Sequence, residues 1–307
     1  MEKLVTTLGN LTGEQAGMIL PHEHVFVDLR TSDQPGYAQA SIKDVIGVMR
    51  PELETARRAG IGTIVECSTV GVGRRVDILK KVSEAAGFPL VLPTGVYREP
   101  WIPGWVHQAD EEALVEWLSA ELNEDIEGND IRAGWIKLSA GDNGLTECER
   151  KVLRAAARSA RDCGAVIGSH TVRGRVVRDQ LDIIEKSCYT PYRFIWIHAH
   201  CEPDFALHIE MAKRGAWIEY DAIGSDSDEL FIELIFKMLD AGFEHQLLLS
   251  QDCPGYDASQ PGGGTLRPYT YIVETFLPRL RDAGGDEDTI HTIVRENPFK
   301  AFARPVA

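Results

Sequence analysis

Residues 17–26 read GMILPHEHVF, a run that begins apolar and closes around two histidines. It is the first of eight short apolar or β-branched runs, which alternate with longer segments of helical period. This alternation predicts βα units around a parallel sheet and disfavours a β-sandwich. Eight units predict a closed (β/α)8 TIM barrel of the α/β class. The expected strands are Gly17–Phe26, Gly62–Cys67, Leu90–Tyr97, Ala133–Leu138, Ala165–His170, Phe194–His198, Ala216–Tyr220 and Gln246–Ser250.

The segments between these runs carry apolar residues at helical spacing, and several are followed by a glycine that can close a helix in the left-handed conformation. The expected helices are Val45–Ala59, Val76–Ala86, Glu111–Glu127, Glu147–Cys163, Val176–Lys186, Asp204–Arg214, Glu229–Ala241 and Tyr271–Ala283. The closing glycines are Gly60, Gly87, Gly164, Gly215 and Gly242. No linker, repeat or shift in composition marks a boundary, so we expect one barrel domain over residues 1–307. The Gly/Pro-rich stretch Pro254–Pro268 makes an unusually long loop, which predicts a functional role.

The composition is that of an ordinary globular protein, with 44% apolar and 26% charged residues. A net charge of −15 would repel phosphate backbones and anionic membranes, so neither nucleic acid nor membrane is an expected partner. The segment Met1–Asn10 has no apolar run behind a basic stretch, and no later segment approaches the ~20 apolar residues that span a bilayer. A cytoplasmic location is therefore expected. The six cysteines show no paired close spacing and are expected to be reduced thiols.

The first run places two histidines, His22 and His24, two residues apart on one strand, so both side chains leave the same face. Such a pair alone is weak evidence for metal binding, because buried histidines with satisfied hydrogen bonds are common. Both lie, however, at the C-terminal end of their strand, where barrel enzymes assemble their active sites. Further candidate ligands end or follow four other strands, and these are Lys137, His170, His198 and Asp252.

Lys137 is the unusual member of this set, because an ammonium group is repelled by metal cations. Crowded by metals, its amine should become neutral and can add carbon dioxide to give a carbamate. The carbamate resembles a carboxylate and can bridge two metals at their usual separation of about 3.5–4 Å. The alternative is an ordinary surface lysine that turns outward.

Nitrogen and oxygen ligands dominate this set, which suits Zn²⁺, Mn²⁺, Co²⁺ or Fe²⁺ and disfavours Ca²⁺. Cys201 and Cys253 lie beside candidate ligands in the sequence. Thiolate coordination is the less favoured interpretation for both, since cysteine commonly serves as a small buried apolar residue.

The order of these residue types resembles that of the phosphotriesterase-like lactonases of the amidohydrolase superfamily, from the N-terminus to Asn297-Pro298. The flanking motifs LPHEH at 20–24, GVGR at 71–74 and SHT at 169–171 agree with this resemblance. In that family a His-x-His pair, a carboxylated lysine, two histidines and an aspartate hold a binuclear metal centre. The resemblance therefore implies the metal ligands His22, His24, Lys137, His170, His198 and Asp252.

The resemblance also distinguishes His198 from His200, because members of the family place a Lys/Arg-Gly pair at a fixed distance after the ligand. Arg214-Gly215 fits His198, so His200 is expected beside the metal centre. Two positions depart from the family pattern. Ala222 stands where many of these lactonases have an arginine, and Gln251 stands where a histidine often precedes the metal-binding aspartate. These departures bear on the shape of the substrate.

The expected mechanism uses a hydroxide that bridges the two metals and attacks a polarised substrate carbonyl. Asp252 would take the proton of this water and pass it to the leaving oxygen. Tyr97 matches a tyrosine that in related lactonases can hydrogen-bond the substrate carbonyl, although rim packing is an equal alternative. Trp101, Trp105 and Tyr256 are expected to form an apolar wall suited to an acyl or alkyl chain.

Arg74, Arg75 and Arg98 are alternative contacts for an anionic substrate group, although most exposed arginines are simply solvated.

Three function classes remain open at this point. The first is a lactonase that opens carboxylic ester rings, with a weak organophosphate side activity. The second is a hydrolase of phosphoesters or amides with the same centre. The third, a metal-binding protein without catalysis, is the least favoured because every ligand type is present. The resemblance also implies a homodimer.

Overall fold

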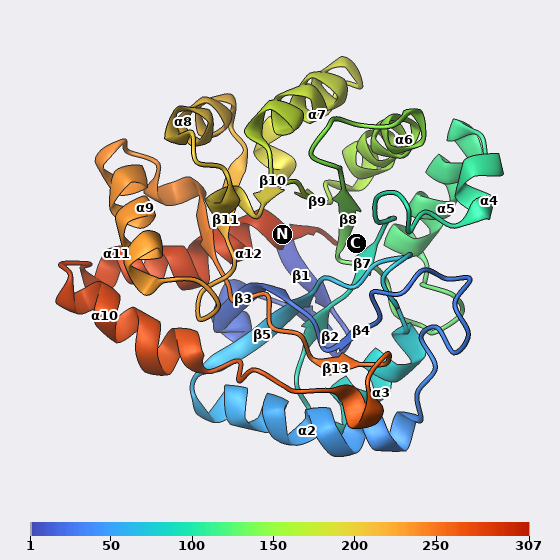
Figure 1. Cartoon of the computed structure of the whole chain (residues 1–307), viewed down its shortest axis with the longest axis horizontal. Coiled ribbons are helices and arrows are strands. Elements are labelled where there is room, and N and C mark those ends of the chain that lie inside the picture. Colours follow the sequence, from blue (N-terminus) through green and yellow to red (C-terminus); the bar gives the residue numbers. More distant parts are fainter. Residues whose placement is uncertain (1, 307) are drawn as a thin grey trace.

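The computed structural model describes residues 2–306, so the two ends of the predicted domain, residues 1 and 307, lie outside the described residues. Its centre is a ring of parallel strands in chain order (Figure 1). The ring strands are β3 (Met18–Glu23), β5 (Ile61–Glu66), β6 (Leu90–Val91), β7 (Pro93–Thr94), β8 (Trp135–Ser139), β9 (Ile167–His170), β10 (Phe194–Ile197), β11 (Trp217–Tyr220) and β12 (Leu247–Leu249). The ring is made of the paired strands β3-β5-β6 and the paired strands β7 to β12.

The ring is closed at its two irregular points by backbone hydrogen bonds. Strands β6 and β7 occupy one strand position that is interrupted at Leu92, whose carbonyl accepts from the Gly134 N–H at 2.8 Å. Between β12 and β3, the Asp252 N–H donates to the His22 carbonyl at 3.2 Å. The predicted (β/α)8 barrel is confirmed.

Helices surround the ring (Figure 1). Their ends are set by capping residues. For example, α6 occupies the predicted range because Thr146 and Glu149 form a capping box at its start and left-handed Gly164 ends it. The outer helices are α2 (Ile42–Arg58), α3 (Val76–Ala86), α5 (Glu111–Asn123), α6 (Glu147–Cys163), α7 (Gly174–Lys186), α8 (Phe205–Arg214), α9 (Asp228–Asp240) and α10 (Leu277–Asp282), the last preceded by π-helical Ile272–Phe276. All five predicted closing glycines have positive φ.

Two apolar layers hold the barrel together. One lies inside the ring and contains Trp135 and Ile195, and the other lies between the strands and the helices. Because side chains alternate along a strand, Lys137 shares the inward face of β8 with Trp135, and its Nζ lies 5.7 Å from the centre of the indole ring. The interior layer therefore leads directly up to the predicted metal ligands.

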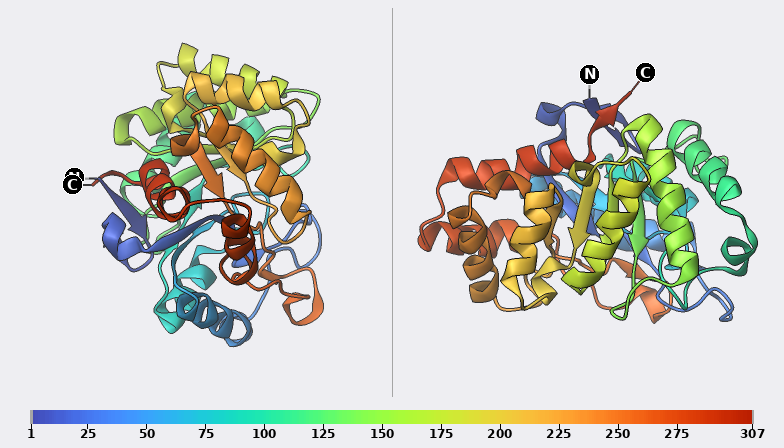
Figure 2. Two further views of the ribbon diagram at one scale, coloured as in Figure 1. Left: turned by 90° about the vertical axis from the view of Figure 1, so that its left-hand side faces the viewer. Right: turned by 90° about the horizontal axis from the view of Figure 1, so that it is seen from above.

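Several elements at the two ends of the chain were not predicted. Strand β1 (Glu2–Thr6) pairs antiparallel with β2 (Gly9–Leu11) and with β14 (Arg304–Pro305). This pairing brings the two chain ends together on one face of the molecule (Figure 2). Short helices that were not predicted also lie near the chain ends, namely α1 (Gly13–Ala16), α11 (Glu287–His291) and α12 (Asn297–Phe302), and one more, α4 (Gly104–Gln108), lies between β7 and α5.

The long loop at 254–268 lies on the opposite face from the chain ends (Figure 2). Within this region β13 (Tyr256–Asp257) pairs in parallel with β4 (Phe26–Val27), which follows the first barrel strand. The loop is thereby attached to the mouth of the barrel. Among residues 2–306, no helix combines the length and apolar character needed to span a bilayer.

Candidate metal centre and active site

A cavity of about 300 Å³ opens at the C-terminal end of the barrel strands. All six predicted metal ligands line it, although they come from several different strand ends. The remaining lining is largely aliphatic. The lining residues are His22, His24, Val27, Leu29, Cys67, Val72, Tyr97, Lys137, His170, His198, Asp252 and Pro254.

The two histidines of the first strand are held through their Nδ1 atoms. His22 Nδ1 lies 2.8 Å from Glu219 Oε1, and His24 Nδ1 lies 2.7 Å from Ser68 Oγ. The Ser68 hydroxyl donates to the Phe26 carbonyl at 2.6 Å, so it accepts from the His24 ring. With Nδ1 occupied, Nε2 of both rings is free to bind a metal.

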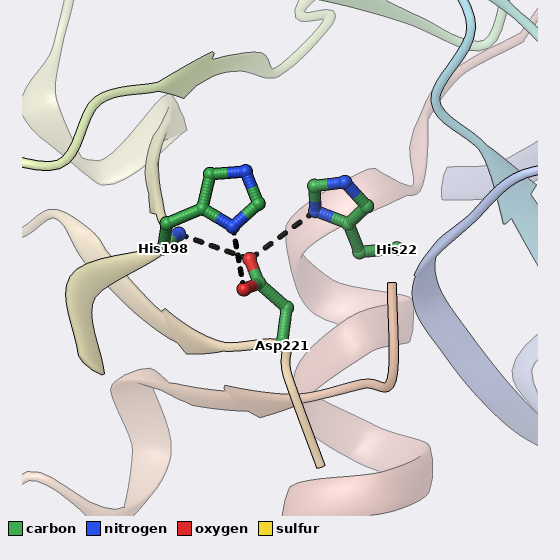
Figure 3. Close-up of side chains that lie close together, drawn as sticks. All are labelled: His22, His198 and Asp221. Atoms are coloured by element: carbon green, nitrogen blue, oxygen red, sulfur yellow. Dashed lines mark hydrogen bonds and ion pairs between the residues drawn. The ribbon is translucent and has the colours of Figure 1, made fainter. Parts of the chain in front are cut away.

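His198 is oriented in the same way, by the buried carboxylate of Asp221 (Figure 3). Asp221 accepts from His198 Nδ1 at 2.7 Å and from the His198 N–H at 2.9 Å, and it also lies 3.2 Å from His22 Nδ1. His198 has φ 64°, a left-handed conformation that is uncommon for a residue other than glycine and occurs at functional sites. Asp221 therefore fixes both the backbone and the ring of His198.

Although His22, His198 and Asp221 come close enough to hold an ion by themselves, their hydrogen bonds indicate another role for Asp221. Its two oxygens already accept from Nδ1 and from the N–H of His198, and it does not line the cavity. We therefore interpret Asp221 as the residue that orients the ligands.

Lys137 and His170 complete the inner wall of the cavity. Lys137 is 2% exposed, so the alternative of a surface lysine is wrong. Within residues 2–306 its ammonium forms no ion pair, and its one hydrogen-bond contact is His22 Nε2 at 3.4 Å. His170 Nδ1 lies 2.6 Å from His198 Nε2, which brings two imidazole nitrogens face to face across the cavity.

Asp252 lies between the two histidines of the first strand, with Oδ1 3.2 Å from His24 Nε2 and 3.4 Å from His22 Nε2. It too has a left-handed backbone, at φ 47°. The guanidinium of Arg267 supports this conformation by donating to the Asp252 carbonyl at 2.7 Å. Glu23, which points away from the cavity, accepts from the Cys253 N–H at 2.7 Å.

The environment sets the protonation states that metal binding requires. Burial, helped by the charge of Lys137, lowers the pKa of His22 to about 4. Burial and the charge of His198 likewise hold the pKa of His170 well below its usual value. Neutral imidazoles at neutral pH offer a lone pair to a metal.

His24, after the first barrel strand, and Asp252, after the eighth, affect each other's pKa. Burial alone would lower the pKa of His24, but its hydrogen bond to Asp252 and the charge of that carboxylate outweigh burial and raise the pKa. For Asp252, burial is outweighed by the charge of His22 and the hydrogen bond to His24, so its pKa is lowered. Asp252 is therefore ionised at neutral pH.

This donor set fits divalent metal ions. Four imidazoles and one carboxylate surround the cavity, as is typical of Zn²⁺ and of the neighbouring transition metals. An ammonium buried beside the imidazoles without a carboxylate partner is electrostatically unfavourable. Conversion of Lys137 to a carbamate would remove that positive charge and supply a further oxygen donor.

The structure places the predicted substrate residues differently. The Tyr97 hydroxyl lies over the site, 3.2 Å from His170 Nδ1, and burial raises its pKa, so it is a protonated phenol. The Trp101 ring packs edge-on against the Tyr97 ring, with 5.4 Å between the ring centres, and Trp101 does not line the cavity.

Trp105 and Tyr256 also lie outside the cavity lining. The short helix α4 directs the Trp105 ring onto the Trp117 ring, with 5.0 Å between the ring centres, and Tyr256 of the long loop stacks on Phe26. The wall predicted from these aromatic residues is instead formed by the aliphatic side chains of the lining.

The predicted arginines also differ in their availability to a substrate. Arg74 is buried and forms a two-point ion pair with Glu121 at 2.6 and 2.8 Å, and Arg75 pairs with Asp77 at 2.6 Å. Arg98 lies over the Tyr97 ring at 5.9 Å, and within residues 2–306 it forms no ion pair. Arg98 is therefore the one of the three that is free to meet an anionic group near the mouth.

Sequence reasoning missed the carboxylates that orient the histidines, Glu219 and Asp221. Glu219 and Asp221 stand two residues apart at the end of β11, so both acids lie on the inward face of a buried strand. His22 and His24 have the same spacing at the end of β3. That spacing was the available signal. His200, expected beside the centre, lies with its Nδ1 3.4 Å from Asp221 Oδ1.

Comparison with known proteins agrees with this geometry. The model of the phosphotriesterase family matches residues 2–302. The chain belongs to the phosphotriesterase family. It is therefore a hydrolase of a family of divalent-metal enzymes.

Among curated proteins of this family, the phosphotriesterase homology protein of Escherichia coli is 25% identical over 94% of this chain and 99% of its own length. The aryldialkylphosphatase of Saccharolobus solfataricus is 25% identical over 96% of this chain and 97% of its own length. A mutant form of the organophosphorus hydrolase of Deinococcus radiodurans is similar in structure, with a TM-score of 0.86 at 28% identity over 98% of this chain and 97% of that one.

A second solved structure is described as organophosphate hydrolysis engineered from a weak promiscuous lactonase template. It has a TM-score of 0.86 and 28% identity over 98% of this chain and 99% of that one. The phosphotriesterase family thus accounts for the whole barrel of this chain.

Proposed function

We propose that this member of the phosphotriesterase family is a lactonase, which opens lactone rings by metal-dependent hydrolysis and has a weak phosphotriesterase side activity. The observation that carries the proposal is the small cavity of about 300 Å³, in which aliphatic side chains face four histidines and the phenol of Tyr97. A planar ring ester fits such a slot, whereas a phosphotriester with three substituents needs wider pockets. The similarity to a structure built on a lactonase template supports the same assignment.

The proposed cofactors are two divalent ions, Zn²⁺ or else Mn²⁺, Co²⁺ or Fe²⁺, and a carbamate on Lys137. The ions would be held by His22, His24, Lys137, His170, His198 and Asp252. When bound, they would lower the pKa of a shared water and polarise the substrate carbonyl.

The residues of the chain supply the remaining functions. Asp252 is ionised and about a third exposed toward the cavity, so it can accept a proton from water and pass it to the leaving oxygen of the ring. Tyr97 is protonated, so its hydroxyl can donate to the substrate carbonyl or to the charge that develops on it. Glu219 and Asp221 keep the Nε2 atoms of His22 and His198 directed at the cavity.

The second candidate is a phosphoesterase or amidase that uses the same centre. Its support is that one relative is named aryldialkylphosphatase and another, from Danio rerio, N-acetyltaurine hydrolase. Arg98 would then be a contact for a phosphate or sulfonate group, because it has no carboxylate partner within residues 2–306.

A substrate panel separates these candidates. The panel contains an acyl-homoserine lactone, alkyl γ- and δ-lactones, a sugar lactone, paraoxon, aryl esters and N-acyl amides, each assayed with enzyme reconstituted with Zn²⁺, Mn²⁺ or Co²⁺. We expect the highest kcat/KM for a lactone, since kcat/KM compares the binding of transition states. A phosphoester or amide that exceeds every lactone by about tenfold, or roughly 1.4 kcal/mol, would overturn the lactonase assignment.

The proposed metal content and subunit structure are tested without substrate. Elemental analysis of the reconstituted protein should give about two ions per chain, not counting any ion bound outside the barrel centre. One ion or none would contradict the binuclear centre. Light scattering at micromolar concentration should give the mass of a homodimer, and a monomer would contradict that proposal.

A further inference from the structure

A second group of metal-binding side chains lies outside the barrel centre. Glu99 follows β7, His107 lies in α4, and Cys148 lies in the first turn of α6. One ligand atom of each lies within 4.8 Å of the others, and Glu99 Oε1 is 3.1 Å from His107 Nε2. We call these three residues the Glu99–His107–Cys148 cluster.

The cluster is close to the geometry of a zinc site. Zn–N, Zn–O and Zn–S bonds of about 2.0–2.3 Å in a tetrahedron separate the ligand atoms by roughly 3.3–3.7 Å. The carboxylate and imidazole are already at 3.1 Å, and all three ligand atoms lie within 4.8 Å of one another, so closure requires the Cys148 side chain to move by at most about an ångström. Rotation of one side chain suffices for such a movement.

The three backbones are held in place independently of any ion. The Lys151 ammonium, one turn along α6, donates to the carbonyls of Val106 at 2.9 Å and His107 at 3.1 Å. The Glu149 carboxylate accepts from the Glu99 N–H at 3.2 Å. The cluster is therefore preorganised by contacts between α4, α6 and the segment after β7.

The charges around the thiol also favour a cation. Burial, together with the negative charges of Glu99 and Glu149, raises the pKa of the Cys148 thiol against the positive charge of Lys151. A bound cation would offset the negative charges and stabilise the thiolate, which is the form that binds metal. The alternative is a simple ion pair between Glu99 and His107, which would not account for the nearby thiol of Cys148.

We propose that the Glu99–His107–Cys148 cluster is a separate site for a thiophilic transition-metal ion, with Zn²⁺ as the expected ion and water as its fourth ligand. Sulfur, nitrogen and oxygen donors together select Zn²⁺, Co²⁺ or Cd²⁺ over Mg²⁺ and Ca²⁺. On binding, the thiol releases its proton to solvent. The site is independent of the reaction catalysed at the barrel centre.

Such an ion would link the active-site loop to the outer helix α6. Glu99 stands two residues after Tyr97, whose phenol contacts His170. A bound ion would fix the segment between Tyr97 and α4, which lies beside the mouth of the barrel. The expected consequence is slower hydrogen exchange at residues 97–108 when the ion is bound.

The test compares full-length proteins saturated with Zn²⁺ and then freed of excess ion. Wild type and a Cys188→Ala control, which removes an exposed thiol outside the cluster, should hold one ion per chain more than Cys148→Ala. With Co²⁺, wild type and control should show a thiolate-to-cobalt charge-transfer band in the near ultraviolet that Cys148→Ala lacks. His107→Gln, at a side chain that is 45% exposed, provides a second variant that should fold.

We expect His107→Gln to weaken this ion by more than the 10- to 100-fold that loss of an outer-shell partner costs. Equal ion content and an equal charge-transfer band in wild type and Cys148→Ala would overturn the proposal. Because the readout is a difference of one ion, it does not depend on the number of ions in the barrel. Absence of lactone turnover would overturn the proposed function and leave this difference unchanged.

Discussion

Asp221→Asn tests whether the orientation of the candidate metal ligands contributes to metal affinity when all of these ligands are still present. It keeps the size of the side chain and leaves all six candidate ligands in place. Asp221 accepts from the His198 N–H at 2.9 Å and from His198 Nδ1 at 2.7 Å. An amide has one oxygen, so one of these two buried donors would face an NH₂ group.

The size of the effect follows from these contacts. A buried donor left without an acceptor costs about 1–3 kcal/mol. A second estimate is the 10- to 100-fold loss of metal affinity when an outer-shell partner is removed, or about 1.4–2.7 kcal/mol. We therefore expect the Asp221→Asn variant to bind the ion held by His198 10- to 100-fold less tightly than wild type does. His22 should be affected less than His198, because Glu219 still accepts from its Nδ1 at 2.8 Å.

The assay is a metal titration in competition with a chromophoric chelator. Asp226→Asn is the matched control, because Asp226 follows the same strand but reaches only His200 Nε2, at 3.9 Å, and is 55% exposed. Exposed pairs contribute little, so this control should stay within about twofold of wild type. A natively folded Asp221→Asn variant that binds both ions as tightly as the control would refute the reasoning.

Three further substitutions test other parts of the site. Lys137→Ala should remove most lactone turnover, and propionate should restore part of it by filling the place of the carbamate; full activity would show that Lys137 is not part of the centre. Tyr97→Phe removes one neutral hydrogen bond of about 0.5–1.5 kcal/mol, so kcat/KM should fall about 2- to 12-fold with unchanged metal content. An unchanged kcat/KM would show that the Tyr97 hydroxyl does not contact the substrate. Trp105→Ala should leave kcat/KM unchanged because its side chain lies outside the cavity; a large loss would mean that the loop brings Trp105 onto the substrate.

The convergence of the candidate ligands was predictable because it depends on strand periodicity and barrel topology. His22 and His24 share a face because strands alternate, and the ends of parallel strands meet at one mouth. The same holds for helix ends set by local capping, as in α6. The pairing of β1 with β14 was not predicted, because it joins the two ends of the chain and neither strand has a strong local pattern.

The aromatic wall was predicted poorly for a related reason. Trp105 is close to Tyr97 in the sequence, but a turn of helix directs it onto Trp117. Trp101 is held by a hydrogen bond from its Nε1 to the Leu29 carbonyl, which belongs to a distant loop. Loop conformations depend on such long-range contacts, so proximity in the sequence does not give proximity in the site.

The same distinction bears on which lactone the enzyme would prefer. The candidate metal ligands lie at the ends of barrel strands, whereas the proposed substrate contacts would come from loops. Next to Ala222, Arg267 of the long loop donates to the Gln251 carbonyl at 2.6 Å and lines a cavity of about 160 Å³ with Ile223 and Tyr271. A positive charge thus reaches the Ala222 region from the eighth loop. Substrate preference should therefore change with substitutions in residues 257–266, and metal affinity should stay constant because this range leaves out Arg267 and its contact with Asp252.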